Sequence, residues 1–304
     1  MMFWLLTIVL AYLFFGLSSL ADKLILIDSS HPKSYTFYVG FLGIAAVVVI
    51  PFIKFGFPLP ISFVWIILEA ITYIAGMYSM FVALHKFDVS KAMATIGGLQ
   101  PILILIFTFI FLGIQIVGGA TILAFVFLFI GSILISIEKR INVTKDYLRL
   151  TIFSALMFSL EYVFAKLVFL HEPFLKGFIW MRIFSFAVVM LFLLSAKFRK
   201  EVFQKHSVLN NKTKFIFFFG QVSGGTATIL QSFSISLVPL AFLSILNALR
   251  GLQYIFLFLM TLFFSYFLPK ILKEKMSKTL ILQKIISILL IVSGLVILAF
   301  VPTM

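Results

Sequence analysis

The chain has 304 residues, of which 63% are hydrophobic and 11% charged, and its mean hydropathy is +1.22. Soluble domains are about half apolar, so this composition excludes a soluble globular protein and indicates a chain that crosses a membrane many times. The net charge of +14 does not indicate a nucleic-acid partner, because the basic residues lie in short segments between apolar runs and form no basic patch with interleaved aromatic residues.

Ten apolar runs are long enough to cross a membrane as helices, because a hydrocarbon core of about 30 Å needs about 20 residues. None shows the alternation of a β-barrel strand, and no loop is long enough for a soluble domain. The N-terminal run is too long for the apolar region of a signal peptide, so we expect it to be retained. The predicted spans are residues 3–27, 34–54, 61–84, 89–113, 116–138, 147–170, 174–197, 214–237, 239–268 and 280–302.

Lys and Arg residues gather beside the loops that follow odd-numbered spans. Eighteen lie there, against two beside the loops that follow even-numbered spans. The positive-inside rule therefore predicts that the odd-numbered loops face the cytoplasm and that both termini lie outside.

Short stretches recur in the same order in the two halves of the chain. "FGLSSLADKLIL", which ends the first span, resembles "FSLEYVFAKLVF", which ends the sixth, and aligns Lys23 with Lys166. "GLQ" at residues 98–100 of the fourth span recurs at 251–253 in the ninth, and Gly131 of the fifth corresponds to Gly294 of the tenth. The offsets are 143, 153 and 163 residues, which implies longer loops in the second half.

Each half holds five spans, and an odd number makes the second half enter the membrane from the opposite side. The predicted fold is an all-α integral membrane protein with ten transmembrane helices as two inverted five-helix repeats. The repeats are residues 1–138 and 147–304, joined by the loop 139–146, and they form one membrane domain. Inverted repeats are a recurrent plan of secondary transporters, which bind substrate near the midplane where the halves meet.

The repeated glycines and amides fall near the middle of their spans. Pro101 lacks an N–H and clashes with the preceding turn, so we expect a helix break there, next to Gly97 and Gly98, and a corresponding hinge at Gly251. Glycines also seat helix crossings, and this packing role is the alternative.

"FVALHKFDVSKAMATIGGLQPILILIFTFIFLG", followed by "GGATILAFVFLFIGSILI", resembles the drug/metabolite transporter (DMT) superfamily, specifically its EamA-like branch. The second half shows the same plan in "SFSISLVPLAFLSILNALRGLQYIFLFLMTLFF". Glu274 stands where the family commonly has a glutamate before the last span, and Arg182 matches an arginine often found early in the second span of a repeat. The first repeat departs from the family, with no such glutamate after Leu112-Gly113 and no such arginine near Gly40.

The resemblance covers essentially the whole chain and implies a multi-pass transporter of the cytoplasmic membrane. It also implies termini in the cytoplasm, opposite to the orientation that the loop charges favour.

Four ionisable residues lie deep in predicted spans, namely Glu69, Glu161, Arg182 and Arg250, and such residues are functional candidates by default. Arg250 keeps its charge at any accessible pH and needs a partner. Either Glu161 or Glu69 pairs with it structurally, or it holds a substrate carboxylate or phosphate while a glutamate exchanges protons.

Two lysines, Lys23 and Lys166, lie about four residues from span ends, so we expect their long side chains to extend to the lipid headgroups.

Other polar residues within the spans could line the same interior, although each alone could equally make an interhelical hydrogen bond. They include Ser223 and Thr226. The predicted substrate-binding set is Glu69, Tyr73, Gln100, Glu161, Arg182, Gln221, Asn247, Arg250 and Gln253.

Missing motifs narrow the class. The chain has no phosphate-binding loop that ends in Gly-Lys-Ser/Thr, no cysteine, and four histidines without the spacing of a metal site, so we expect no cofactor and no metal. We expect a secondary transporter, not an enzyme, that exports a small organic metabolite or drug, such as an amino acid or another anionic or zwitterionic solute, by alternating access. Its expected partners are this solute, membrane lipids and protons.

The alternative is an integral membrane enzyme that acts on a lipid-linked substrate. It needs acidic and histidine side chains together at one interface, whereas His85 with Asp88 and His171 with Glu172 follow spans three and six and so lie on opposite faces.

Overall fold

The computed structural model describes residues 3–26, 32–87, 89–113, 118–136, 144–203, 211–267 and 278–300. Within these ranges every regular element is a helix. The helices are α1 (Phe3–Leu26), α2 (Pro32–Leu42), the 3₁₀ helix η1 (Gly43–Phe52), α3 (Pro60–Lys86), α4 (Val89–Leu112), α5 (Gly119–Ser136), α6 (Lys145–His171), α7 (Phe174–Phe192), α8 (Ala196–Phe203), α9 (Asn211–Leu237), the 3₁₀ turn η2 (Leu240–Phe242), α10 (Leu243–Ala248), α11 (Gly251–Phe267) and α12 (Lys278–Phe300).

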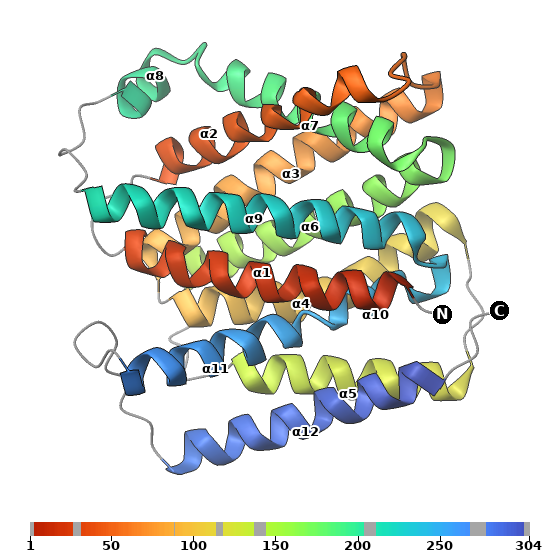
Figure 1. Cartoon of the computed structure of the whole chain (residues 1–304), viewed down its shortest axis with the longest axis vertical. Helices are drawn as coiled ribbons and strands as arrows, with labels where there is room; N and C mark the ends of the chain where they lie inside the picture. The colour runs from red at the N-terminus through yellow and green to blue at the C-terminus, as the bar shows by residue number, and fades with distance from the viewer. Residues whose placement is uncertain are drawn as a thin grey trace.

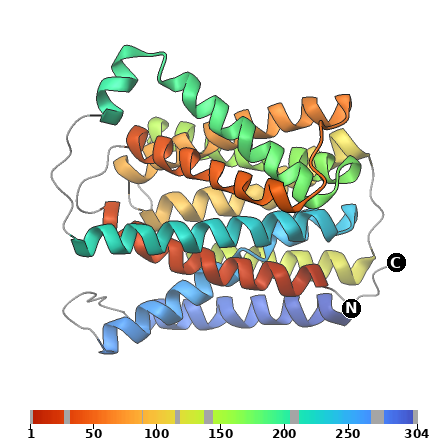
Figure 2. The same ribbon diagram turned by 45° about the horizontal axis from the view of Figure 1, so that its top comes forward.

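The long helices run side by side as one bundle, and α1 begins at the end of the bundle at which α12 finishes (Figures 1 and 2). Within the described residues, seven segments are long and apolar enough to cross a membrane. They are Phe3–Ala21, Ser34–Phe52, Pro60–Lys86, Thr95–Leu112, Lys145–His171, Phe174–Phe192 and Leu240–Met260. Two shorter apolar helices, Gly119–Ile135 and Leu282–Leu298, lie in α5 and α12. The chain is therefore a multi-pass helical membrane protein.

Each predicted span coincides with a helix or a pair of helices, with two differences in their interiors. The predicted second span is α2 followed directly by η1, and the predicted ninth span is divided at Leu249–Arg250, between α10 and α11. The predicted break at Pro101 is wrong, because α4 continues through this residue from Val89 to Leu112. Proline removes one internal hydrogen bond, here to the carbonyl of Gly97, and membrane helices tolerate that loss.

Three helix pairs make the most extensive contacts in the bundle. Helix α1 lies along α9, α3 along α6, and α5 along α12, as Figure 1 shows most clearly for the first and last pairs. The bundle interior is held by apolar side chains from α1, α6, α10 and α12, among them the fully buried Ile8, Val163, Leu246 and Ile291.

Glycines allow a close helix crossing between α5 and α12. A Cβ added at Gly131 would lie 2.7 Å from Ile291 Cγ1 and 3.1 Å from the Ser287 carbonyl oxygen. A Cβ at Gly294 would lie 2.8 Å from Leu128 Cγ and 3.0 Å from the Ala124 carbonyl oxygen. Any side chain at either position would push the two helices apart.

Candidate functional site

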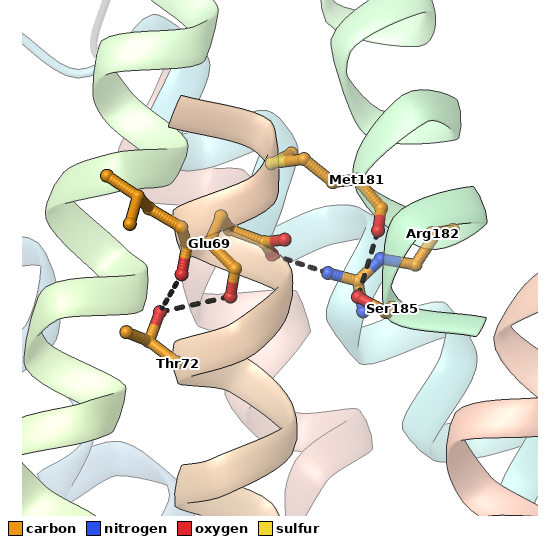
Figure 3. Close-up of polar contacts among 6 residues, drawn as sticks. Glu69, Thr72, Met181, Arg182 and Ser185 are labelled. Carbon is orange, nitrogen blue, oxygen red and sulfur yellow. Dashed lines mark hydrogen bonds and ion pairs between the residues drawn. The ribbon is translucent and has the colours of Figure 1, made fainter. Parts of the chain in front are cut away.

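A buried ion pair joins α3 to α7 inside the bundle. Glu69 Oε1 and Arg182 Nη2 are 2.7 Å apart, and both side chains are almost fully buried (Figure 3). Tyr73 follows Glu69 by one helical turn, and its ring lies 4.4 Å from Arg182 Cζ, as a cation–π contact. The second carboxylate oxygen of Glu69 and Nε of Arg182 have no hydrogen-bond partner among the described residues.

Two nearby hydroxyl groups, of Thr72 and Ser185, make their hydrogen bonds elsewhere and not to the Glu69 or Arg182 side chains. Thr72 Oγ1 donates to the carbonyls of Leu68 and Glu69, and Ser185 Oγ donates to the carbonyl of Met181, so each hydroxyl bonds to its own helix (Figure 3). The free hydrogen-bonding capacity of the pair is therefore left for water or a bound solute.

The second feature of the interior is the interruption between α10 and α11. Its freed carbonyls are satisfied from neighbouring helices: Tyr12 of α1 donates to the Leu246 carbonyl at 3.0 Å, and Ser132 of α5 donates to the Ala248 carbonyl at 2.7 Å. Arg250 N–H returns to the Asn247 carbonyl at 2.9 Å. In a region without bulk water these hydrogen bonds replace the ones that the helix loses, so they stabilise the interruption.

Arg250 lies at this interruption and reaches α4, where its Nη1 donates to Gln100 Oε1. Its Nε, and both polar atoms of the fully buried Asn247 amide, have no hydrogen-bond partner in the part of the chain that the structure describes. Unpaired donors at a buried site are costly, since each loses its bonds to water without replacement. They therefore mark the surroundings of Arg250 as a place where an acceptor can bind.

Glu161 of α6 connects the two features. The charge of its half-buried carboxylate interacts with those of Glu69, Arg182 and Arg250, yet it makes no direct hydrogen bond or ion pair within the described ranges. The four deep charges that the sequence singled out thus form one electrostatic group. The predicted structural pairing of Arg250 with a glutamate is wrong, because Glu69 binds Arg182 and Arg250 binds Gln100.

The glycines of α4 have a packing role, the alternative that the sequence left open. A Cβ at Gly97 would lie 2.8 Å from the Tyr254 hydroxyl, and one at Gly98 would lie 3.1 Å from Ile133 Cγ1. Gly251, the first residue of α11, is packed so closely against Ser132 that a Cβ would collide with its hydroxyl.

Two predicted site residues lie elsewhere. Gln221 donates to the Tyr35 hydroxyl, between α9 and α2, and Gln253 donates to Ser19, between α11 and α1. Both make the interhelical hydrogen bonds expected of single polar residues in membrane helices. Glu274 lies outside the described residues.

Lys166 is the clearest departure from the sequence prediction. It does not extend to the headgroups: it is buried, and its Nζ donates to the carbonyls of Ile235, Ser236 and Val238 at 3.0, 3.2 and 2.6 Å. These carbonyls lie in the last turn of α9 and just after it, where the helix dipole favours a cation. The local sequence around Lys166 could not predict this contact, because α6 and α9 are far apart in the chain. The side chain of Lys23 lies outside the described part.

No family model matches the chain, and no curated protein matches it. A solved structure described only as "Crystal structure of protein" is similar over 96% of this chain and 95% of that chain, with a TM-score of 0.69 and 15% sequence identity. At this identity the likeness concerns the fold alone. The chain therefore shares a known helical fold along nearly its whole length.

Proposed function

We propose that the chain is a secondary transporter of a small organic solute, with ten spans in two inverted five-helix repeats. Under this proposal α1 is equivalent to α6, α3 to α9, α4 to α10–α11, and α5 to α12. The packing supports the equivalence: α1 lies on α9 as α6 lies on α3, and α11 contacts α1 as α4 contacts α6.

Contacts between single residues support the same symmetry at the α5–α12 crossing. Gly131 approaches Ile291 and Ser287, and Gly294 approaches Leu128 and Ala124. Residues 131 and 294, 128 and 291, and 124 and 287 are each 163 residues apart, so the contact maps onto itself when the halves are exchanged.

A second symmetric contact involves the repeated glutamines. Ser159 donates to the Gln100 carbonyl at 3.4 Å, and a Cβ at Gly16 would lie 3.5 Å from the Gln253 carbonyl oxygen. Gly16 and Ser159 share the offset of 143 residues, and the glutamines share that of 153. These equivalent contacts extend the proposed symmetry to the interior, where such repeats place their binding site.

The observation that carries the transport proposal is the interrupted span with unpaired donors at its break. Broken helices near the midplane are how many secondary transporters present polar groups to a solute. Here Arg250 and the Asn247 amide offer donors, so the group they bind is an acceptor such as a carboxylate or phosphate. An anionic or zwitterionic metabolite, such as an amino acid, fits this chemistry.

The rest of the proposal follows from the same site and from the resemblance to EamA-like transporters. The two repeats rock against each other to give alternating access, in the direction of export from the cytoplasm and across the cell membrane. Glu69 and Glu161, beside the arginines, are the groups that exchange protons in a proton-coupled cycle.

The first test is a thermal-shift screen of the purified protein against amino acids, sugar phosphates, nucleotides and cationic drugs. A solute that binds the folded state raises its apparent stability by mass action. The expected result is a shift by an anionic or zwitterionic metabolite that disappears in Arg250→Ala. It should persist in the matched control Arg149→Ala, which removes an exposed arginine from the first turns of α6.

A solute found in this way is then tested for counterflow in proteoliposomes. Uptake that depends on the protein supports transport, and loss of its pH dependence in Glu69→Gln/Glu161→Gln supports proton coupling. A shift that survives Arg250→Ala would remove Arg250 from the site, and binding without counterflow would contradict transport.

A further inference from the structure

Residues 53–59 join η1 to α3 and lie against α7. We call this segment the strap. The Trp180 indole of α7 donates to the Gly56 carbonyl at 3.0 Å. Its ring stacks on Phe55, with centroids 5.3 Å apart and planes 17° apart, and lies 5.7 Å from the Phe57 ring. Trp180 therefore holds the middle of the strap by aromatic contacts and one hydrogen bond.

Glu172, at the corner between α6 and α7, fixes the end of the strap. Its Oε1 accepts a hydrogen bond from Leu59 N–H at 2.6 Å, and its Oε2 lies 2.9 Å from Lys176 Nζ. Leu59 caps the N-terminus of α3, where N–H groups are unsatisfied and the helix dipole favours a negative charge. One carboxylate thus joins the α6–α7 corner to the start of α3.

The carboxylate of Glu172 is held in its charged form. Burial by itself raises the pKa of Glu172, but the hydrogen bonds from Lys176 and from Leu59 N–H outweigh it, and the pKa lies below its ordinary value. His171, beside it in sequence, is engaged with the Leu167 carbonyl of its own helix. The contact with the strap is therefore charge-assisted, which is the stronger class of hydrogen bond.

The strap and the interior site lie on the same two helices. Glu69 follows Leu59 by ten residues, and Arg182 follows Glu172 by ten residues, so about 15 Å of helix separates the two connections. At the end of the bundle α3 and α7 are joined by the strap, and inside it by the Glu69–Arg182 ion pair. Separating these helices at this end requires the strap to come off α7.

We propose that the strap is a gate at the end of the bundle where α1 begins and α12 ends, and that Glu172 is its latch. The inference rests on the proposed function, since a gate serves a transport path. In the structure the gate is closed. It opens when Leu59 N–H leaves Glu172 and the strap leaves Trp180, which frees the start of α3 to move away from α7.

The chain has no cysteine, so one introduced thiol reports opening without background. Ser62 is fully buried in the first turn of α3, and its hydroxyl lies next to the Glu172 carboxylate. In Ser62→Cys, a membrane-impermeant thiol reagent should react slowly while the gate is closed. Adding Glu172→Ala should speed the reaction about ten- to a hundredfold, the factor expected for loss of a hydrogen bond to a charged group. Trp180→Ala, which frees the strap but keeps the Glu172 carboxylate beside the thiol, should speed it as well; acceleration in Glu172→Ala alone would be a charge effect on the thiol and would overturn the gate.

Graded variants separate the parts of the latch. Glu172→Gln keeps an acceptor for Leu59 N–H but loses the charge, so its acceleration should be smaller than that of Glu172→Ala. Lys176→Gln removes a partner that is partly exposed and leaves the bond to Leu59, so its effect should be the smallest.

The matched control is Ser79→Cys, which is buried in the same helix, 17 residues after Ser62 and toward the other end of α3. A latch that holds a local gate leaves the rate at position 79 unchanged in Glu172→Ala. Equal acceleration at both positions would mean general loosening and overturn the gate, as would an unchanged rate at position 62. Labelling needs no solute, so the two proposals can fail separately. If Glu172→Ala speeds labelling at position 62 but no metabolite stabilises the protein, the proposed transport is refuted and the strap is still mobile.

Discussion

The buried pair of Glu69 and Arg182 allows a quantitative prediction about stability. Its side chains retain 1% and 6% of their exposure, and the two charges meet at 2.7 Å. Removing one partner of such a pair leaves a buried charge without compensation, which costs about 3–5 kcal/mol. We expect Glu69→Leu to destabilise the protein by about this amount.

Arg182→Met should be less harmful than Glu69→Leu. A carboxylate that loses its partner can take up a proton, whereas a guanidinium keeps its charge. The double variant Glu69→Leu/Arg182→Met replaces both charges by apolar side chains of similar volume, and such replacements are often neutral. It should therefore be more stable than either single variant.

The assay is reversible unfolding in mixed micelles as denaturing detergent is titrated, followed by helical circular dichroism. A double-mutant cycle then gives the coupling between the two positions. Destabilisations that simply add would refute the reasoning, because they would mean that each charge is compensated by something other than its partner.

Three further predictions concern the framework around the site. Gly131→Ala should destabilise the protein by about 1–3 kcal/mol, because its Cβ would lie 2.7 Å from Ile291 Cγ1, whereas Gly225→Ala, with open space around it, should be neutral or slightly stabilising in the same unfolding assay. Lys166→Met should cost about 1–3 kcal/mol, because three carbonyls at the end of α9 lose their donor. Glu172 has a pKa below its ordinary value of 4.5, so its stabilisation is complete above that pH and is lost as the pH falls through the lowered pKa; an acid-induced drop in melting temperature should be present in the wild type and absent in Glu172→Gln.

The helices could be predicted from the sequence because the signal for a membrane span is local. A run of about 20 apolar residues can satisfy its backbone in lipid only as a helix, whatever it packs against. The helices lie within a few residues of the predicted spans, and the interruption in the predicted ninth span lies beside Gly251, where a hinge was predicted. The predicted break at Pro101 was wrong. Proline removes one hydrogen bond of the helix, but whether the helix then breaks depends on the neighbouring helices that support it.

The pairing of the deep charges could not be predicted in the same way. Burial in the membrane explains why Glu69 and Arg250 both need partners, but which groups they meet depends on how α3, α4 and α7 pack. From the sequence, two glutamates were the candidate partners of Arg250. In the structure its partner is the Gln100 amide. Lys166 shows the same limit, since its position near a span end is equally compatible with a headgroup and with the end of another helix.

The two proposed repeats differ in where they carry charged residues. Glu161 of α6 aligns with Ser18 of α1, at the offset that also aligns Lys166 with Lys23. Along the α1–α9 seam, a Cβ at Gly224 would lie 2.9 Å from the Ser18 hydroxyl and one at Gly220 would lie 2.7 Å from Ala21 Cβ.

This seam is thus filled by close backbone packing, while the equivalent α3–α6 seam carries Glu69 and Glu161. A repeat can supply the same scaffold twice, but two identical charged seams would bury twice the charge at twice the desolvation penalty. Confining the charges to one seam leaves the other free to act as a rigid support, and under the proposed function it puts Glu69 and Glu161 on one side of the solute held at Arg250.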